Sequence, residues 1–179
     1  DCKVILTVAR LVPWKGVDLL IRALEKIDDN KLRLLIVGDG PDLQRLERLV
    51  GGLKVSGRVE FKYKVPLDEV FKYYYLANIF VLDSQYEGLS HVLLEALMAA
   101  KPIIASRSGG NPEVIEDEQN GLLVDYSNVD QLVVAIKRML SEEKWQSAEY
   151  KEKCHASLKK FNWQNVIEQT SKIIEELKS

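Results

Sequence analysis

The chain has 179 residues, of which 46% are hydrophobic and 29% charged, a composition typical of a soluble globular domain. The formal net charge of −2 argues against a basic face for nucleic acid, so any bound phosphate needs a local site. No apolar run reaches the roughly 20 residues that span a bilayer, and no signal peptide opens the chain. Because the first strand follows Asp1 almost at once, we expect a fragment or a processed chain.

The cysteines and histidines predict no metal centre. Cys2 and Cys154 lie at opposite ends of the chain, and only two histidines accompany them. This spacing fits neither a zinc cluster nor a disulfide framework. We therefore expect free thiols, as in a reducing compartment, and a cytoplasmic location.

Short apolar runs along the chain predict buried strands. The first is Lys3–Val8, with the sequence KVILTV. Further strands are expected at Leu32–Val37, 59–61, Ile79–Leu82, 102–105 and 121–124.

The segments between these runs show apolar residues at helical spacing. Gly51 and Gly52 follow one such segment and are expected to end it with a positive-φ cap. After Asn128 the pattern is helical almost to the end, with breaks near Ser141 and residues 161–162. The other helices are expected at 17–27, 42–50, 67–77 and 90–100.

This alternation predicts an α/β fold with βαβ units. We expect one domain over residues 1–179, a Rossmann-like doubly wound parallel sheet of about six strands with helices on both faces. Such sheets bind ligands at the carboxyl ends of their strands. The polar motifs described next each follow a predicted strand.

The loop after the first strand carries two cations, Arg10 and Lys15, beside Pro13 and Gly16. Arginine presents a planar fork to phosphate and lysine a mobile point charge, so both side chains could reach one diphosphate. A solvated loop with two incidental charges explains the same spacing, and the loop alone does not decide between them.

The segment Glu87–Glu95 predicts a second anion site. Gly88 allows close backbone approach, and Ser90 is a natural N-cap for the following helix. The first helical turn then directs free N–H groups toward a ligand. Glu95 lies in an apolar stretch, where either paired ribose hydroxyls or a local Arg or Lys would satisfy its carboxylate. His91 is expected near the same cleft.

Two glycine-containing turns have structural explanations. Asn111 as N-cap, Pro112 at the first helical position and Glu113 in the first turn form a complete helix start after Gly109-Gly110. Gly38 belongs to a Gly-Asp-Gly-Pro turn that lacks the third glycine of a dinucleotide fingerprint, so a tight strand-to-helix turn is the simpler interpretation.

Taken in order, these motifs resemble the carboxyl-terminal domain of the retaining GT-B glycosyltransferases of family 4, which have two facing Rossmann-like domains. The Glu-x7-Glu pattern from Glu87 to Glu95 is the most specific of them. The resemblance covers nearly the whole chain through the segments Val8-Ala9-Arg10-Leu11, Lys15-Gly16, Val37-Gly38-Asp39-Gly40-Pro41, Val59-Glu60-Phe61, Ser84, Glu87-Gly88, Glu95-Ala96, Pro102-Ile103-Ile104-Ala105-Ser106, Gly109-Gly110-Asn111-Pro112-Glu113-Val114-Ile115, Asn120-Gly121-Leu122-Leu123-Val124 and Phe161-Asn162-Trp163.

The resemblance implies a role for each site residue. Arg10 and Lys15 would hold the donor diphosphate and offset charge on the leaving group, and Glu87 would contact sugar hydroxyls; these three are the expected catalytic residues. Glu95 would hold the ribose. The remaining donor-binding positions are Gly38, Gly88, Leu89 and Ser90, with the base against the backbone of Tyr63, Lys64 and Val65.

The implied activity is metal-independent transfer of a sugar from a nucleotide diphosphate sugar, with retention of configuration, to a glycan or lipid-linked acceptor. No cofactor is expected. The acceptor would be held by an amino-terminal domain absent from this chain, so the isolated chain should bind donor weakly and transfer little. Polysaccharide biosynthesis and peripheral contact with the inner face of the membrane are the expected setting of the full-length protein.

Three alternatives remain at this point. One is half of a sugar-nucleotide 2-epimerase of the same architecture, and another is a non-catalytic nucleotide-binding module. The third is a structural domain in which Arg10, Lys15 and Glu95 pair with one another. Ser90 and His91 depart from the glycine and small or apolar residue of many relatives, which leaves the donor sugar open. Ala100-Lys101 likewise departs in a turn.

Overall fold

The computed structural model describes residues 2–162. Trp163 and the amphipathic carboxyl-terminal stretch expected from the sequence lie outside the described residues. In the sequence of that stretch, Val166, Ile167, Ile173, Ile174 and Leu177 follow the spacing of the apolar stripe of a helix.

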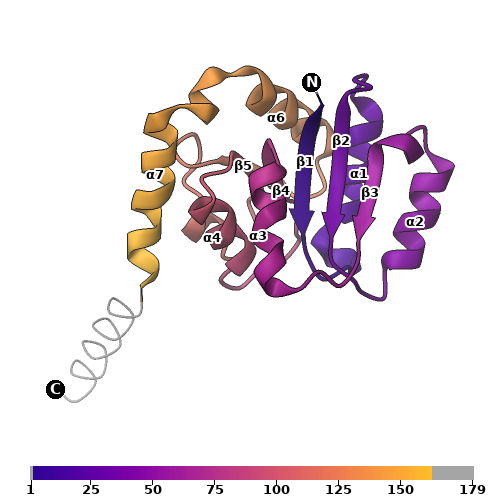
Figure 1. The fold of residues 1–179 in the computed structure, drawn as a ribbon, viewed down its shortest axis with the longest axis horizontal. Helices are drawn as coiled ribbons and strands as arrows, with labels where there is room; N and C mark the ends of the chain where they lie inside the picture. The colour runs from indigo at the N-terminus through magenta and orange to yellow at the C-terminus, as the bar shows by residue number, and fades with distance from the viewer. Residues whose placement is uncertain (1, 163–179) are drawn as a thin grey trace, which may run out of the picture.

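Six parallel strands form one sheet in the order β3-β2-β1-β4-β5-β6 (Figure 1). The strand order reverses between β1 and β4, so this is the topological switch point of a doubly wound sheet. The predicted first, second and fourth strands are confirmed residue for residue. The third and sixth differ by one residue at one end, and the fifth is shifted by one residue toward the carboxyl terminus. The strands are β1 Lys3–Val8, β2 Leu32–Val37, β3 Val59–Lys62, β4 Ile79–Leu82, β5 Ile103–Ser106 and β6 Leu122–Val124.

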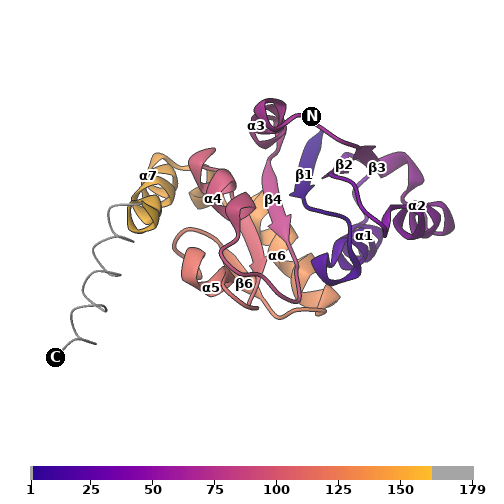
Figure 2. The same cartoon turned by 90° about the horizontal axis from the view of Figure 1, so that it is seen from below.

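Helices cover both faces of the sheet, as predicted. Figure 2 shows α3 and α4 on one side, with α1 and α6 on the other. Neighbouring helices also contact each other: α1 packs on α6, and α4 packs on α7. The helices are α1 Val17–Lys26, α2 Leu43–Gly52, α3 Leu67–Leu76, α4 His91–Met98, α5 Asn111–Val114, α6 Val129–Ser141 and α7 Ala148–Leu158.

The strands form because their apolar side chains are buried from both sides. Every residue of β4 and β5 is buried, and Phe80 and Ile104 have no exposed surface. Strands sandwiched in this way lose alternation and become continuous apolar runs, which is the pattern visible in the sequence. Helix α1 buries one stripe of its surface against the sheet through Leu20, Ile21 and Leu24.

Two predicted caps are wrong. Gly51 and Gly52 do not form a positive-φ cap but continue α2 to its last residue, and the extended Leu53 ends the helix. Asn111 is not the N-cap of α5 but its first residue, with Gly110 as N-cap. The Asn111 side-chain amide instead donates to Ser106 at the end of β5.

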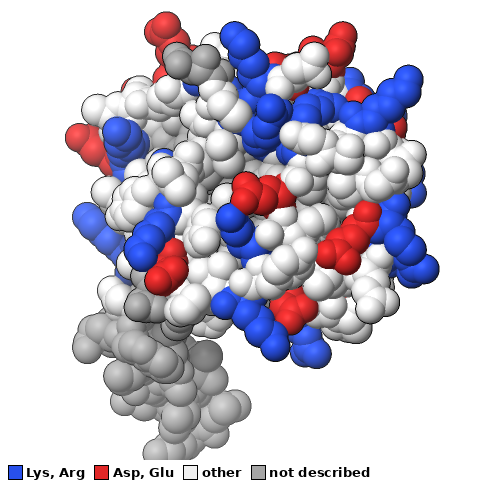
Figure 3. Space-filling view, turned by 45° about the vertical axis from the view of Figure 1, so that its right-hand side comes forward, with Lys and Arg blue, Asp and Glu red and all other residues white. Residues whose placement is uncertain are grey.

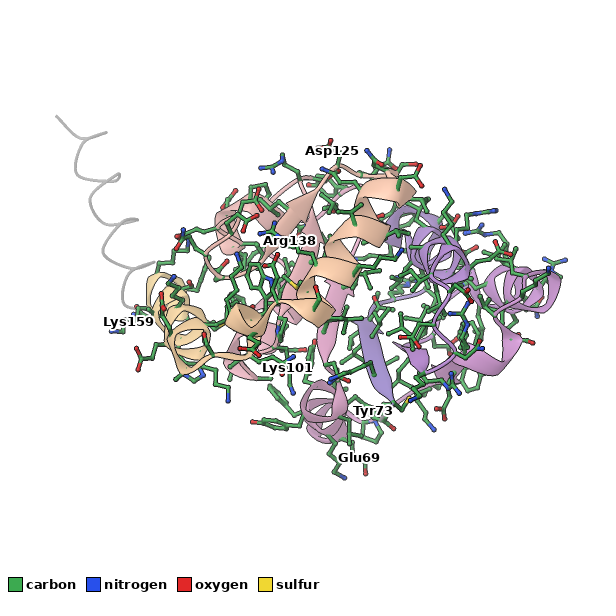
Figure 4. The ribbon with its side chains drawn as sticks, turned by 90° about the horizontal axis from the view of Figure 1, so that it is seen from above. Glu69, Tyr73, Lys101, Asp125, Arg138 and Lys159 are labelled. Carbon is green, nitrogen blue, oxygen red and sulfur yellow. The ribbon has the colours of Figure 1, made fainter. Side chains whose placement is uncertain are left out.

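The turn after α4 contains a residue in the left-handed conformation. Ala100 has φ 48°, its N–H donates to Leu97, and the N–H of Lys101 donates to Ala96, which together make a Schellman ending. The Lys101 ammonium lies beside the carboxyl-terminal end of α3, where it donates to the carbonyl oxygens of Tyr75 (2.9 Å) and Ala77 (3.0 Å) (Figure 4). These two hydrogen bonds hold the turn after α4 against the end of α3.

Replacing Ala100 by glycine is expected to stabilise the fold by about 1 kcal/mol, since only glycine adopts this conformation without steric cost. Urea unfolding of the two proteins measures the difference. Ala99→Gly is the matched control: Ala99 has φ −78° and is buried, so its replacement should cost about 0.5–1 kcal/mol. Equal changes at both positions would contradict the strain at Ala100.

Candidate functional site

Three loops meet at the carboxyl ends of β1, β4 and β5. The N–H of Gln85 donates to the carbonyl oxygen of Trp14 at 2.8 Å, which ties the loop after β4 to the loop after β1. The N–H of Gly110 donates to the carbonyl oxygen of Glu87 at 2.9 Å, which ties in the loop after β5. We call these segments, residues 9–16, 83–90 and 107–110, the three-loop junction.

Glycines allow the three loops to touch. A Cβ on Gly16, which has φ 64°, would lie 1.8 Å from the carbonyl oxygen of Asp83. A Cβ on Gly109, which has φ 53°, would lie 2.3 Å from the carbonyl oxygen of Glu87. No other residue fits either position without moving backbone. The double glycine at 109–110 thus packs against the loop that carries Glu87 and Gly88.

Lys15 and Glu87 form an ion pair across the junction. The Lys15 Nζ donates to the Glu87 Oε1 at 2.5 Å, and the two side chains are 19% and 10% exposed. Two residues 72 positions apart are thereby brought together at the switch point of the sheet. An ammonium has three donors, so Lys15 keeps donors for an additional anion.

Arg10 lies on the same loop but is exposed. Within residues 2–162 its guanidinium forms no hydrogen bond or ion pair, so the structure does not bring it into the Lys15–Glu87 pair. A mutual pairing of Arg10, Lys15 and Glu95 is not seen in this part of the chain either.

The amino-terminal end of α4 borders the junction. Ser90 is the N-cap residue, as predicted, but its hydroxyl makes no capping bond. Its Oγ is buried without a hydrogen-bond partner, while Gly88, Leu89 and His91 are exposed. The first-turn amides of a helix have no partner within the helix and attract anions. This end of α4 thus offers donors and a partial positive charge beside Lys15.

Glu95 has an unexpected partner. The Tyr74 hydroxyl of α3 lies 2.9 Å from the Glu95 Oε2 and 3.1 Å from the carbonyl oxygen of Val92. Burial, then the Glu95 charge, raises the pKa of the Tyr74 hydroxyl, which therefore stays a neutral donor. The alternative of an Arg or Lys partner is wrong; the tyrosine run 73–75 was the signal available, with Tyr74 as its buried member.

Gly38 and the residues after β3 border the junction from the other side. A Cβ on Gly38 would lie 1.9 Å from the carbonyl oxygen of Ala9, and its N–H donates to Lys62. Tyr63 is half exposed and donates its hydroxyl to Glu47 at 2.9 Å. Next along the chain are the exposed Lys64, with a positive φ of 29°, and the partly buried Val65.

A buried polar network supports the junction and was missed in the sequence. The Ser106 hydroxyl donates to the Ser84 carbonyl oxygen at 2.5 Å. The Asn111 Nδ2 donates to the Ser106 carbonyl oxygen at 3.1 Å. Its Oδ1 is buried without a partner among the described residues.

Asp83 was missed as well. It follows β4 directly and is only 3% exposed, and neither carboxylate oxygen has a partner in the described range. Burial, and secondarily the charge of Asp18, raises the pKa of the Asp83 carboxyl to about 7. Its position between an apolar strand and Ser84 gave no sign that it would be buried without a partner.

Comparisons with known proteins identify the family. Residues 1–160 match the family described as Glycosyl transferases group 1. The chain belongs to this family, and its fold is that of the GT-B carboxyl-terminal half.

Among curated relatives, the chain is 34% identical over 172 residues to a GDP-mannose-dependent alpha-(1-6)-phosphatidylinositol monomannoside mannosyltransferase of Mycolicibacterium smegmatis, covering 91% of this chain and 45% of that protein. It is 32% identical over 180 residues to a D-inositol 3-phosphate glycosyltransferase of Acidothermus cellulolyticus, covering 94% and 40%. The chain thus spans less than half the length of these relatives.

Solved structures share the fold. Sucrose-phosphate synthase from Thermosynechococcus elongatus matches with TM-score 0.86 and 30% identity, covering 99% of this chain and 46% of that one. Anabaena HepE in complex with UDP matches with TM-score 0.84 and 21% identity, covering 98% and 49%. The carboxyl-terminal domain of a group 1 family protein from Francisella tularensis matches with TM-score 0.76 and 23% identity, covering 89% and 86%.

The surface charges, helix lengths, possible metal ligands and cysteines add four findings. Charges of both signs are scattered over the face shown in Figure 3. None of the helices in the described range is long and apolar enough to cross a membrane. Residues 2–162 hold no group of three or more His, Cys, Asp or Glu side chains placed to bind a metal ion. Cys2 and Cys154 are free thiols.

Proposed function

We propose that this chain is the donor-binding half of a retaining family 4 glycosyltransferase that takes its sugar from a nucleotide diphosphate sugar. The observation that supports this most is the juxtaposition, at the switch point, of Lys15, Glu87 and the amino-terminal end of α4. Membership of the glycosyl transferase group 1 family and the UDP complex of a protein with the same fold support the same conclusion.

In this proposal the donor diphosphate lies over the junction. Lys15 and Arg10 offset its charge, and the amides around Leu89 and Ser90 bind the distal phosphate. As the glycosidic bond breaks, charge builds on the leaving diphosphate, and positioned cations together with the helix dipole stabilise it. The unpartnered Ser90 hydroxyl is a further donor at this place. No metal or other cofactor has a role in this scheme.

The sugar and the nucleoside occupy opposite sides of the diphosphate. Glu87 contacts sugar hydroxyls while it holds Lys15. Glu95 binds the ribose hydroxyls with one carboxylate oxygen, while the Tyr74 hydroxyl holds the other at 2.9 Å. The base packs against the backbone at Tyr63, Lys64 and Val65, beyond the close contact between Gly38 and Ala9.

The remaining parts of the proposal concern the whole protein. The acceptor, a glycan or a lipid-linked sugar, is held by an amino-terminal domain, and residues 1–179 act as one nucleotide-sugar-binding domain. A cytoplasmic location with peripheral contact at the inner membrane face completes it, and the isolated chain transfers little because it lacks the acceptor side.

Calorimetric titration of the chain with UDP, GDP, ADP and their sugars, without metal, tests the donor site. We expect one nucleotide to bind, and Arg10→Ala/Glu95→Ala to weaken its binding at least roughly 100-fold, because each lost hydrogen bond to a charged group is worth about 1.5–3 kcal/mol. The matched control is Arg22→Ala/Glu25→Ala, which removes the same charges from the exposed face of α1. Equal weakening by both variants, or no nucleotide binding at millimolar concentration, would contradict the proposal.

A further inference from the structure

Asp83 is a buried acid at the start of the second loop of the three-loop junction, directly after β4. Its carbonyl oxygen is the atom that a Cβ on Gly16 would strike, so the residue lies against the start of α1. Asp83 is only 3% exposed, and neither of its carboxylate oxygens accepts a hydrogen bond from the described residues. A buried carboxylate without donors is costly, and the neutral acid is favoured. The proposed donor scheme gives this group no role.

The groups that act on Asp83 electrostatically come from two other elements. Asp18, in the first turn of α1, adds negative charge, although Arg45 lies 3.5 Å from its carboxylate. Tyr126, between β6 and α6, is a neutral phenol whose pKa is raised by burial and then by the charges of Asp18 and Asp83. On the adjoining loops Lys15 is already paired with Glu87. Among the described residues no cation lowers the pKa of the Asp83 carboxyl.

We propose that Asp83 takes up a proton when an anionic diphosphate binds to the three-loop junction. This inference rests on the proposed donor site. A diphosphate brings negative charge to the loops that begin at Asp83 and at the β1 end beside it, and a nearby like charge disfavours an ionised carboxyl. By linkage, a ligand that favours the protonated form also binds that form more tightly.

The affinity for the diphosphate is expected to fall as the pH rises. Below about pH 7 the Asp83 carboxyl carries its proton before the ligand arrives, and the diphosphate binds to a neutral group. Above that pH the carboxyl must first recover a proton, so the affinity falls as the pH rises. For a single group with this titration midpoint, the loss between pH 6 and pH 8 is at most about tenfold. Asp83 thus couples proton uptake to ligand binding and is not a catalytic residue.

Titration of the 179-residue chain with UDP and GDP at pH 6, 7 and 8, each in two buffers of different ionisation enthalpy, tests the coupling. At pH 7 the parent should take up a substantial fraction of a proton per nucleotide bound, beyond any uptake by Asp83→Asn, and its affinity should fall up to about tenfold more steeply with pH. The nucleotide's own phosphate titration is common to both proteins and cancels. Asp125→Asn, an exposed aspartate after β6, is the matched control and should behave like the parent.

The possible failures are distinguishable. If nucleotide binds and Asp83→Asn keeps the parent's proton uptake and pH dependence, the role of Asp83 is wrong while the donor site stands. If neither nucleotide binds either protein at any pH, the donor site fails for these ligands and the inference falls with it.

Discussion

Replacing Asp83 by asparagine is expected to stabilise the chain by up to roughly 4 kcal/mol at pH 8 and to change its stability little at pH 4. The Asp83 carboxyl has its pKa raised from 3.8 to about 7 by burial. Between these values the unfolded chain loses the proton while the folded chain keeps it. Stability therefore falls with rising pH across this window by about 1.4 kcal/mol per pH unit, and the deficit is constant above pH 7.

Urea unfolding of parent and variant at pH 4, 5, 6, 7 and 8 measures this difference. Other carboxyls have opposite dependences, such as Glu118, whose pKa Arg138 and Lys144 lower to about 2. These contributions are common to both proteins and cancel in the difference. The exposed control Asp125→Asn should stay within about 0.5 kcal/mol of the parent at every pH. A stability gain for Asp83→Asn that does not vary with pH would show that the carboxyl is not titrating as a buried acid.

Replacing Gly16 by alanine is expected to cost about 2–5 kcal/mol of folding stability and to abolish nucleotide binding at the junction. A φ of 64° costs a residue with a Cβ about 1–2 kcal/mol. The added Cβ would also lie 1.8 Å from the Asp83 carbonyl oxygen, so backbone must move, at a further cost of about 1–3 kcal/mol. Moving that backbone separates the loops that bring Lys15 to Glu87.

Urea unfolding and the nucleotide titration together check this prediction. Gly57→Ala is the control, because nothing lies within 4 Å of a Cβ at that position and its φ is not positive. It should unfold within about 1 kcal/mol of the parent. A Gly16→Ala protein as stable as Gly57→Ala would contradict the close approach of the two loops.

Local sequence patterns were enough to predict the fold class. Three strands were located to the residue because strands covered on both faces are continuous apolar runs. The alternation of such runs with amphipathic helices implied a parallel sheet, and a parallel sheet places every strand-to-helix loop at one edge. The sequence thereby predicted that the loops carrying Lys15 and Glu87 would share an edge.

Caps were less predictable, because several groups compete for the same side chain. Asn111 has the ideal chemistry for an N-cap, yet its amide bonds to Ser106 on the neighbouring strand. Gly51 and Gly52 have the freedom to form a left-handed cap, yet α2 continues through them. After α4 the left-handed residue is Ala100, which is not a glycine. It takes this conformation in the turn that ends α4 and leads into β5.

By itself, the sequence determined the elements of this protein, their order and the edge of the sheet at which its polar motifs gather. Only the tertiary structure decided which of those side chains meet. Lys15 pairs with Glu87 across 72 residues, Tyr74 holds Glu95, and Asp83 has no partner within the described chain. The physical reason is range: hydrophobic periodicity acts over a few neighbouring residues, whereas the burial and pairing of a charge depend on every element that packs around it.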